Sequence, residues 1–300
     1  MISPITEPHL DYGLLWCYTV YRFDRSGREY IEMIGAVIGD IVGSRFEFIN
    51  HKSKSFDLFG KGCDFTDDSV MTFAVAAAIL DCRGDYRDLS DKAVSWMQKL
   101  GRTYTDRGYG TMFNSWIYLD EPHPYNSFGN GSAMRVSPCG YAARSIDEAK
   151  ELSYKVTSVT HNHPDGLKGA EAAAVAVFFA KSGYYISDIG DYIHRHYYKL
   201  DFSIDEIRDS YIFSEACEQT VPQAIMAFLD STDFEDAIRS AISLGGDSDT
   251  IGAITGGIAA AYYGVPNDIR NRALTYLDSN LLDILIKFED RFGTVRVHNP

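Results

Sequence analysis

Three glycines inside one predicted helix constrain the fold of this 300-residue chain more than any other feature. Residues 250–263 have the apolar composition of a buried helix, yet glycines interrupt it at Gly252, Gly256 and Gly257. Each glycine costs about 1 kcal/mol relative to alanine within a helix, so the three cost on the order of 3 kcal/mol. Close approach of another backbone would offset that cost. We therefore expect this helix at the centre of the fold, with its N-terminus beside Asp249 held rigidly.

Helix signals recur along the rest of the chain, without the alternation of strands and helices that would indicate a parallel sheet. An apolar stripe at helical spacing follows Asp67, Ser145 begins a capping-box pattern, and residues 170–180 are apolar enough for a buried helix. Further helices are expected at 222–229, with Pro222 in the first turn, at 233–243, and in one amphipathic segment at about 268–291. The sequence predicts a mainly α fold in one compact domain.

The first 32 residues differ from the rest, because strand formers dominate residues 14–23. We interpret residues 1–32 as an N-terminal extension and residues 33–300 as the folded domain. One hypothesis is that translation starts at Met33, which a native peptide from upstream of Met33 would disprove. The segment has no basic start and its apolar stretch is too short to cross a bilayer, so no signal peptide or membrane anchor is expected.

Charge and cysteine usage exclude some classes of function. Lys and Arg number 28 against 42 for Asp and Glu, which gives a formal net charge of -14 and disfavours non-specific nucleic-acid binding. The five cysteines are scattered and show no metal-ligand spacing, which favours a reducing, cytoplasmic compartment. The acidity is explained either by a solvated surface or by a cation site.

Two acidic segments are candidates for that cation site. Each begins a predicted helix and supplies two carboxylates and a hydroxyl: Thr66, Asp67 and Asp68 in one, and Asp247, Asp249 and Thr250 in the other. Either segment alone is equally well explained as a helix cap, since Asp and Thr are favoured there. A cap needs only one side-chain oxygen, however, and the Gly245-Gly246 pair allows the tight turn that would aim both carboxylates at one point.

Four carboxylates gathered at two helix ends would repel one another unless cations lay between them. Oxygen ligands of this kind suit Mg²⁺ or Mn²⁺ better than zinc. Two such ions about 3.5–4 Å apart form a familiar hydrolytic arrangement. The residues alone do not establish that the two segments meet.

Two further segments have both a structural and a ligand-binding interpretation. Residues 126–131, rich in Asn and Gly, form either a plain turn or a loop that enters a helix at Ser132 and offers backbone N–H groups to a diphosphate. His161 and His163 form an HxH pattern, which is weak evidence for a metal when it stands alone.

Taken together and in order, these motifs resemble the ADP-ribosylglycohydrolase family, including the dinitrogenase reductase-activating glycohydrolases. The resemblance covers residues 33 to about 265. Five short segments carry it: 39–47, 65–69, 127–135, 160–164 and 245–251.

The resemblance implies an all-α, multi-helix orthogonal bundle that binds two Mg²⁺ or Mn²⁺ ions. The metal ligands it implies are Thr66, Asp67, Asp68, Asp247, Asp249 and Thr250, with Asp249 bridging the ions. The catalytic residues it implies are Glu47, on a mobile flap, and the metal-bound carboxylates of Asp67 and Asp249. The substrate-binding residues it implies are Ser127, Phe128, Gly129, Asn130, Gly131 and His161, with Phe128 placed to stack near a ring. Ser69 stands where the family commonly has Thr, and it keeps the hydroxyl.

The implied reaction is hydrolysis of the bond between ADP-ribose and an acceptor, with an Arg or Ser side chain of a protein as the expected acceptor. Two alternatives stay open. The same scaffold could act on another ADP-ribosyl or glycosidic substrate, such as a nucleic acid or a metabolite, or the chain could be a non-catalytic, crystallin-like binding protein. We expect a monomer whose partner is an ADP-ribosylated protein or another ADP-ribosyl conjugate.

Overall fold

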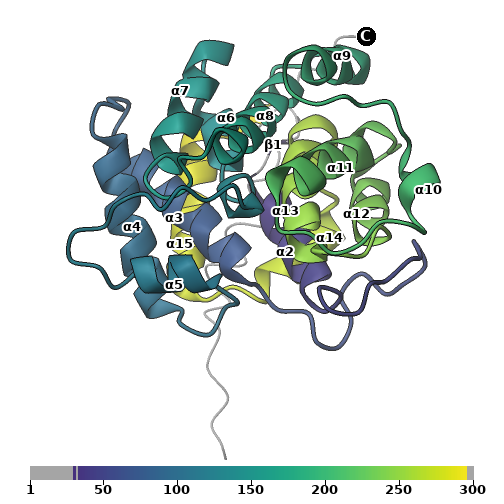
Figure 1. Ribbon diagram of the computed structural model, residues 1–300, viewed down its shortest axis with the longest axis horizontal. Coiled ribbons are helices and arrows are strands. Elements are labelled where there is room, and N and C mark those ends of the chain that lie inside the picture. Colours follow the sequence, from purple (N-terminus) through teal and green to yellow (C-terminus); the bar gives the residue numbers. More distant parts are fainter. Residues whose placement is uncertain (1–29, 32, 296–300) are drawn as a thin grey trace, which may run out of the picture.

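The computed structural model describes residues 30–31 and 33–295, and helices dominate this part of the chain (Figure 1). The helices are α2 (Ile34–Ser44), α3 (Asp67–Asp81), α4 (Leu89–Thr103), α5 (Thr111–Trp116), α6 (Ser137–Ala142), α7 (Ile146–Thr157), α8 (Pro164–Lys181), α9 (Ile186–His196), α10 (Ile204–Ile207), α11 (Cys217–Leu229), α12 (Phe234–Ile242), α13 (Ser248–Tyr263), α14 (Asn267–Leu274) and α15 (Ser279–Phe292). A 3₁₀ turn, η1 (Asn130–Ser132), precedes α6, and β1 (Tyr30–Ile31) pairs antiparallel with β2 (Thr294–Val295). The prediction of an all-α fold is confirmed. The strand-forming segment 14–23 lies outside the described residues.

Helix α13 lies at the centre of the bundle, where it packs along α2 (Figure 1). A Cβ atom added at Gly252 would lie 2.5 Å from the carbonyl oxygen of Gly39, closer than real Cβ contacts come. Gly256 and Gly35 approach each other in the same way one turn further on. The close backbone approach expected from the glycines of this helix is therefore confirmed, and α2 is the partner.

The third glycine of α13 has a different neighbour. A Cβ atom at Gly257 would lie 3.0 Å from the Cβ of Ser137, the first residue of α6. All residues of α13 from Ser248 to Ala261 are buried. Close contact with the α2 backbone on one side and with the Ser137 side chain on another thus fixes the axis and the N-terminus of the helix.

Two predicted boundaries are wrong. Pro222 lies inside α11 rather than in its first turn, because the helix already begins at Cys217, whose N–H donates to the carbonyl of Phe128 (3.1 Å). The amphipathic segment at 268–291 is two helices rather than one. The side chain of Asp278 accepts from the N–H groups of Asn280 and Leu281 and starts α15 after a turn.

The other predicted helices agree with the structure. Helix α3 follows Thr66, α8 buries nearly all of residues 169–180, and α12 begins after Asp233. Only half of the capping box forms at α7. The Ser145 side chain accepts from the Glu148 N–H, but the Glu148 carboxylate accepts from Arg144 instead of Ser145.

Within the described residues, no helix has both the length and the apolar character needed to cross a membrane. Four cysteines fall within this part of the chain, and all are buried free thiols: Cys63, Cys82, Cys139 and Cys217.

Candidate active site

The N-terminus of α3 supplies the first acidic segment. The Asp67 N–H donates to the carbonyl of Arg107 (2.7 Å), which fixes the backbone there. Asp68 is buried, and its Oδ2 accepts from the Thr250 hydroxyl (3.3 Å) on α13. The two acidic segments therefore meet, which the residues alone did not establish. The other oxygen of Asp68, Oδ1, is buried without a partner among the described residues.

The N-terminus of α13 supplies the second segment. Gly245 and Gly246 both have positive φ (65° and 69°), so the chain makes a turn that other residues adopt only with strain. Asp247 and Asp249 follow it and are buried. The Thr250 N–H donates to Asp249 Oδ1 (3.0 Å).

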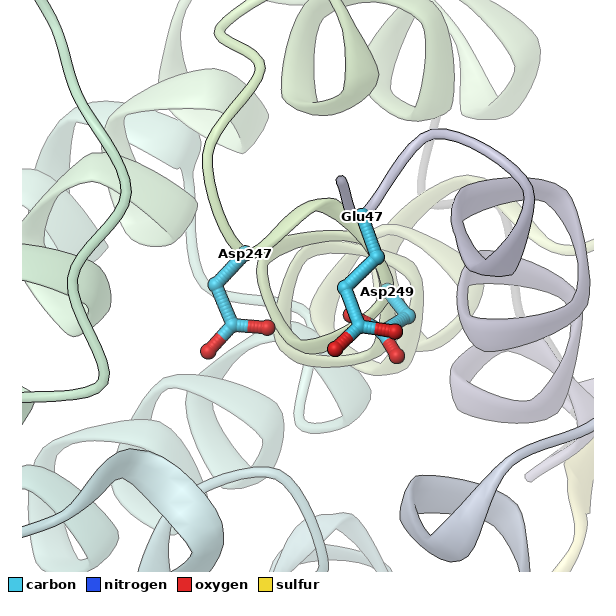
Figure 2. A group of neighbouring side chains, drawn as sticks. All are labelled: Glu47, Asp247 and Asp249. Carbon is cyan, nitrogen blue, oxygen red and sulfur yellow. The ribbon is translucent and has the colours of Figure 1, made fainter. Parts of the chain in front are cut away.

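Glu47 completes the carboxylate group from the flap, which we define as residues 45–50, directly after α2. One oxygen each of Glu47, Asp247 and Asp249 lies within 4.8 Å of the other two. Figure 2 shows the Glu47 and Asp249 carboxylates side by side, with Asp247 pointing toward them from the preceding loop. Three such oxygens could bind one cation between them.

Burial disfavours the charged form of every carboxyl group in this cluster. It raises the pKa of Glu47 to about 8 and that of Asp247 to about 6, with neighbouring carboxylates adding to both. The pKa values of Asp67, Asp68 and Asp249 also lie well above the usual range, first because of burial and then because of repulsion by nearby carboxylates. A divalent cation would remove this repulsion, so the electrostatics fit a cation site.

Sequence reasoning gave Asp40 no role of its own. This residue of α2 is fully buried, and it accepts hydrogen bonds from Thr66 and Ser69 at the start of α3. Burial raises its pKa to about 6, although these hydrogen bonds partly oppose the shift. An Asp inside the apolar run of residues 33–42 was the signal that could have revealed it.

A cavity of about 310 Å³ opens beside the carboxylates. Most of the predicted site residues line it: Glu47, Asp67, Asp68, Asp247, Asp249, Thr250, Ser127, Gly129, Asn130, Gly131 and His161. Arg135, the last residue of the 127–135 segment, also lines the cavity. Further lining residues had no motif to reveal them, and they include Phe113, Tyr125, Phe213 and Glu215.

Two predicted residues are not part of this lining. Thr66 donates its hydroxyl to Asp40 instead. The Phe128 side chain is 55% exposed and packs edge-on against the His163 ring, with ring centroids 5.7 Å apart.

The loop at 127–131 is more structured than the sequence predicted. It does not enter an α-helix at Ser132, because η1 forms at Asn130–Ser132 and α6 begins only at Ser137. Its N–H groups are partly used, since Gly129 donates to Ser127 Oγ (3.1 Å) and Asn130 donates to the carbonyl of Glu215 (2.7 Å). The Asn130 side chain donates to Asp247 Oδ2 (2.6 Å) and so links this loop to the second acidic segment.

His161 lies against the same loop. A Cβ atom at Gly131 would lie 3.3 Å from His161 Nε2, and His161 Nδ1 lies 2.8 Å from the Thr160 hydroxyl. Burial, followed by the nearby charge of Arg135, holds the pKa of His161 well below its usual range, so the ring is neutral. His163 instead caps α8, where its Nδ1 accepts from the Asp165 N–H (3.2 Å).

Comparison with known proteins places these features in a family. The family model described as ADP-ribosylglycohydrolase matches residues 32–295. Human ADP-ribosylhydrolase ARH3 is 27% identical, and the alignment covers 83% of this chain and 90% of the relative. ADP-ribosylarginine hydrolase Tri1 of Pseudomonas putida is 27% identical over 78% of this chain and 70% of its own. The ADP-ribosyl-[dinitrogen reductase] glycohydrolase of Rhodospirillum rubrum is 25% identical over 82% and 88%.

A solved structure, described as an ADP-ribosylglycohydrolase-related protein complex, has the same fold. Its TM-score is 0.61 at 21% identity, and the match covers 86% of this chain and 95% of that one. The helical fold and the family match define the protein as a hydrolase. The chain belongs to the ADP-ribosylglycohydrolase family.

Proposed function

We propose that this protein hydrolyses the glycosidic bond between ADP-ribose and an acceptor, with an Arg or Ser side chain of a protein as the acceptor. The observation that carries the proposal is the meeting of both acidic segments and Glu47 at one cavity. Structural caps alone would not need so many buried carboxylates at one point, because each raised pKa is an unfavourable feature of the metal-free fold.

Two Mg²⁺ or Mn²⁺ ions fit the donor set. Asp67, Asp68, Asp247 and Asp249 would hold them, with the hydroxyl oxygens of Thr66 and Thr250 as neutral ligands. All these donors are oxygen atoms, and the buried Oδ1 of Asp68 has no partner among the described residues. When bound, such ions supply positive charge for the ribose hydroxyls and for a hydrolytic water.

The non-acidic part of the cavity lining would bind the rest of ADP-ribose. The loop at 127–131, with the neutral ring of His161 behind it, suits the diphosphate because small glycines allow close approach to the backbone. Arg135 lines the same cavity and adds positive charge. Its buried Nε has no partner within the described part of the chain. The Asn130–Asp247 hydrogen bond would fix the position of this loop relative to the carboxylates.

Glu47 is the best placed residue for proton transfer. Its raised pKa, about 8, means that the carboxyl group carries a proton at neutral pH when no cation is near, and that a change in its surroundings would release it. Cleavage at the anomeric carbon builds oxocarbenium character, which nearby carboxylates stabilise. A carboxyl group on the flap could therefore protonate the leaving acceptor or accept a proton from water.

The experiment is a substrate panel of Arg-, Ser- and nucleic-acid-linked ADP-ribose, each with Mg²⁺, Mn²⁺ or chelator. Metal-dependent release of ADP-ribose from a protein conjugate is expected. Release only from nucleic acid or from a metabolite would point to the other substrate class, and no release together with no stabilisation by Mg²⁺ or ADP-ribose would favour a non-catalytic binding protein.

One substitution tests the site itself. Asp249→Asn should lower kcat at least about 100-fold, because it removes a charge at the point where the carboxylates converge. Asp290→Asn makes the same charge change at an exposed position on α15 and serves as the control. Unchanged turnover in Asp249→Asn, with metal content verified, would overturn the assignment.

A further inference from the structure

Both carboxylate oxygens of Asp40 are occupied by donors from the start of α3. Oδ1 accepts from the Thr66 hydroxyl (2.7 Å), and Oδ2 accepts from the N–H groups of Thr66 (2.9 Å) and Ser69 (3.0 Å). The Ser69 hydroxyl also donates to Oδ2. Asp40 has no exposed surface, so water does not compete for these oxygens.

This network determines how Thr66 presents its oxygen. The hydroxyl proton of Thr66 is directed to Asp40, and the same oxygen accepts from the Asp68 N–H (3.3 Å). A hydroxyl whose proton is held on one side keeps lone-pair density for a cation on another. Asp40 would thus orient Thr66 as a neutral ligand without itself contacting a cation.

The position of Asp40 on α2 also connects the two acidic segments. It lies between Gly39 and Gly43 in the sequence, and both glycines touch α13. A Cβ atom at Gly43 would lie 2.5 Å from the Cα of Asp249. One turn of α2 therefore holds α13 through backbone contact and α3 through the Asp40 side chain.

We infer that Asp40 is a positioning residue, which sets the start of α3 against the start of α13 and thereby the affinity for divalent cations. This inference rests on the proposed cation site and goes beyond it, because it assigns the role to a residue that is not a ligand. It also explains Ser69. A hydroxyl at position 69 donates to Asp40, so Ser or Thr can serve there and Ala cannot.

The test is Asp40→Asn, with Mn²⁺ affinity measured by the electron paramagnetic resonance signal of free Mn²⁺ and with no substrate present. Asn keeps one acceptor oxygen, but its amide group would face donors that need an acceptor. We expect Mn²⁺ affinity at least about tenfold weaker and a lower kcat, with helical circular dichroism retained. Wild-type Mn²⁺ affinity in Asp40→Asn would overturn the inference.

A matched control separates positioning from general stability. Thr255→Val removes a buried hydrogen bond from Thr255 Oγ1 to the Ala224 carbonyl (2.8 Å), further along α13. It should lower Tm without changing Mn²⁺ affinity. If Asp40→Asn lowers Tm in chelator as Thr255→Val does and leaves Mn²⁺ affinity intact, Asp40 is merely structural and the inference fails.

A second pair keeps the inference testable if Asp40→Asn does not fold. Ser69→Ala should weaken Mn²⁺ binding, whereas Ser69→Thr should retain it because the donor is kept. Equal Mn²⁺ affinity in the Ala and Thr variants would contradict the inference. Failure of the proposed function looks different, since wild-type protein would then bind Mn²⁺ but release ADP-ribose from no conjugate.

Discussion

The two acidic segments lie at equivalent places, each at the N-terminus of a buried helix, but they are held in different ways. The start of α3 is held by polar contacts, mainly the four donors that converge on Asp40. The start of α13 has some hydrogen bonds, such as that from Asn130 to Asp247, but it is held mainly by shape. Gly39 and Gly43 let α2 touch its backbone, and Gly245 and Gly246 make the turn before it.

The difference separates two ways of placing a carboxylate. A polar network depends on protonation and on charge, and it can be weakened one hydrogen bond at a time. Close backbone packing tolerates no added atoms, since a protein core repacks poorly around them. A single substitution at the start of α13 should therefore cause a large loss of stability. Substitutions at the start of α3 should each cause a smaller loss.

The largest effect is expected from Gly39→Ala. The added Cβ would overlap the Gly252 carbonyl, so α2 and α13 would have to separate along their length. We expect a loss of at least about 3 kcal/mol in unfolding free energy, or no folded protein. Urea denaturation measures it.

Gly110→Ala is the matched control, because a Cβ there meets nothing within 4 Å. If Gly39→Ala unfolded at the same urea concentration as Gly110→Ala, the shape-based account of α13 would be wrong.

An intermediate effect is expected from pH in metal-free protein, which tests charge rather than shape. Burial raises the pKa of Glu47 to about 8 and holds those of Asp67, Asp68 and Asp249 well above their usual range, so the folded state keeps protons that the unfolded chain releases. Such groups stabilise the fold at low pH and lose that contribution as pH rises through the folded pKa. In chelator, Tm should therefore rise as pH falls from 8.5 to 7.

Lys181 opposes this effect within the window, because burial lowers its pKa to about 8 and the folded chain binds fewer protons there than the unfolded chain. The carboxyl groups with raised pKa values outnumber it, so the expected direction is unchanged. The window stops at pH 7 because buried His161 also acts in the opposing direction, below its unfolded pKa of about 6.5.

Glu47→Gln should make Tm depend less on pH. Saturating Mn²⁺ should make Tm fall as pH falls, because the ions need ionised carboxylates. A Tm in chelator that decreases as the pH is lowered from 8.5 to 7 would contradict the raised pKa values of these carboxyl groups.

The smallest effect is expected from Lys52→Met, just beyond the flap. Lys52 Nζ donates to the carbonyls of Tyr211 and Leu244 (both 2.6 Å) and so links the flap to the turn before Asp247. Because Lys52 is only partly buried, we expect a loss of about 1 kcal/mol and a Tm lower by about 2 °C.

A clear fall in kcat, measured at a temperature where the variant stays folded, would show that Lys52 also fixes the flap that carries Glu47. No change in Tm would mean that water replaces both of its hydrogen bonds.

Residues with a local signal were predicted correctly from the sequence. The glycines of α13 indicated close backbone packing. The paired carboxylates at two helix starts indicated a candidate cation site, but only the family resemblance implied that the two segments meet. Each is a short-range pattern with a physical cost that something must offset.

Features that depend on distant contacts were not predicted. Pro222 lies within α11 because the helix already begins at Cys217. The Cys217 N–H donates a hydrogen bond to the carbonyl of Phe128, which is far away in the sequence. In the sequence, Asp40 is only one polar residue in an apolar run. Its role is visible only in the structure, where α3 packs against it. Phe213 and Glu215 reach the cavity from a segment without a motif.

The most direct test of the central claim is anomalous diffraction from crystals of the wild-type protein soaked in Mn²⁺. The account predicts two peaks about 3.5–4 Å apart, bounded by carboxylates of both α3 and α13 and close to Glu47. Peaks confined to one acidic segment, or no peak at a concentration that saturates a hydrolytic metal site, would contradict it.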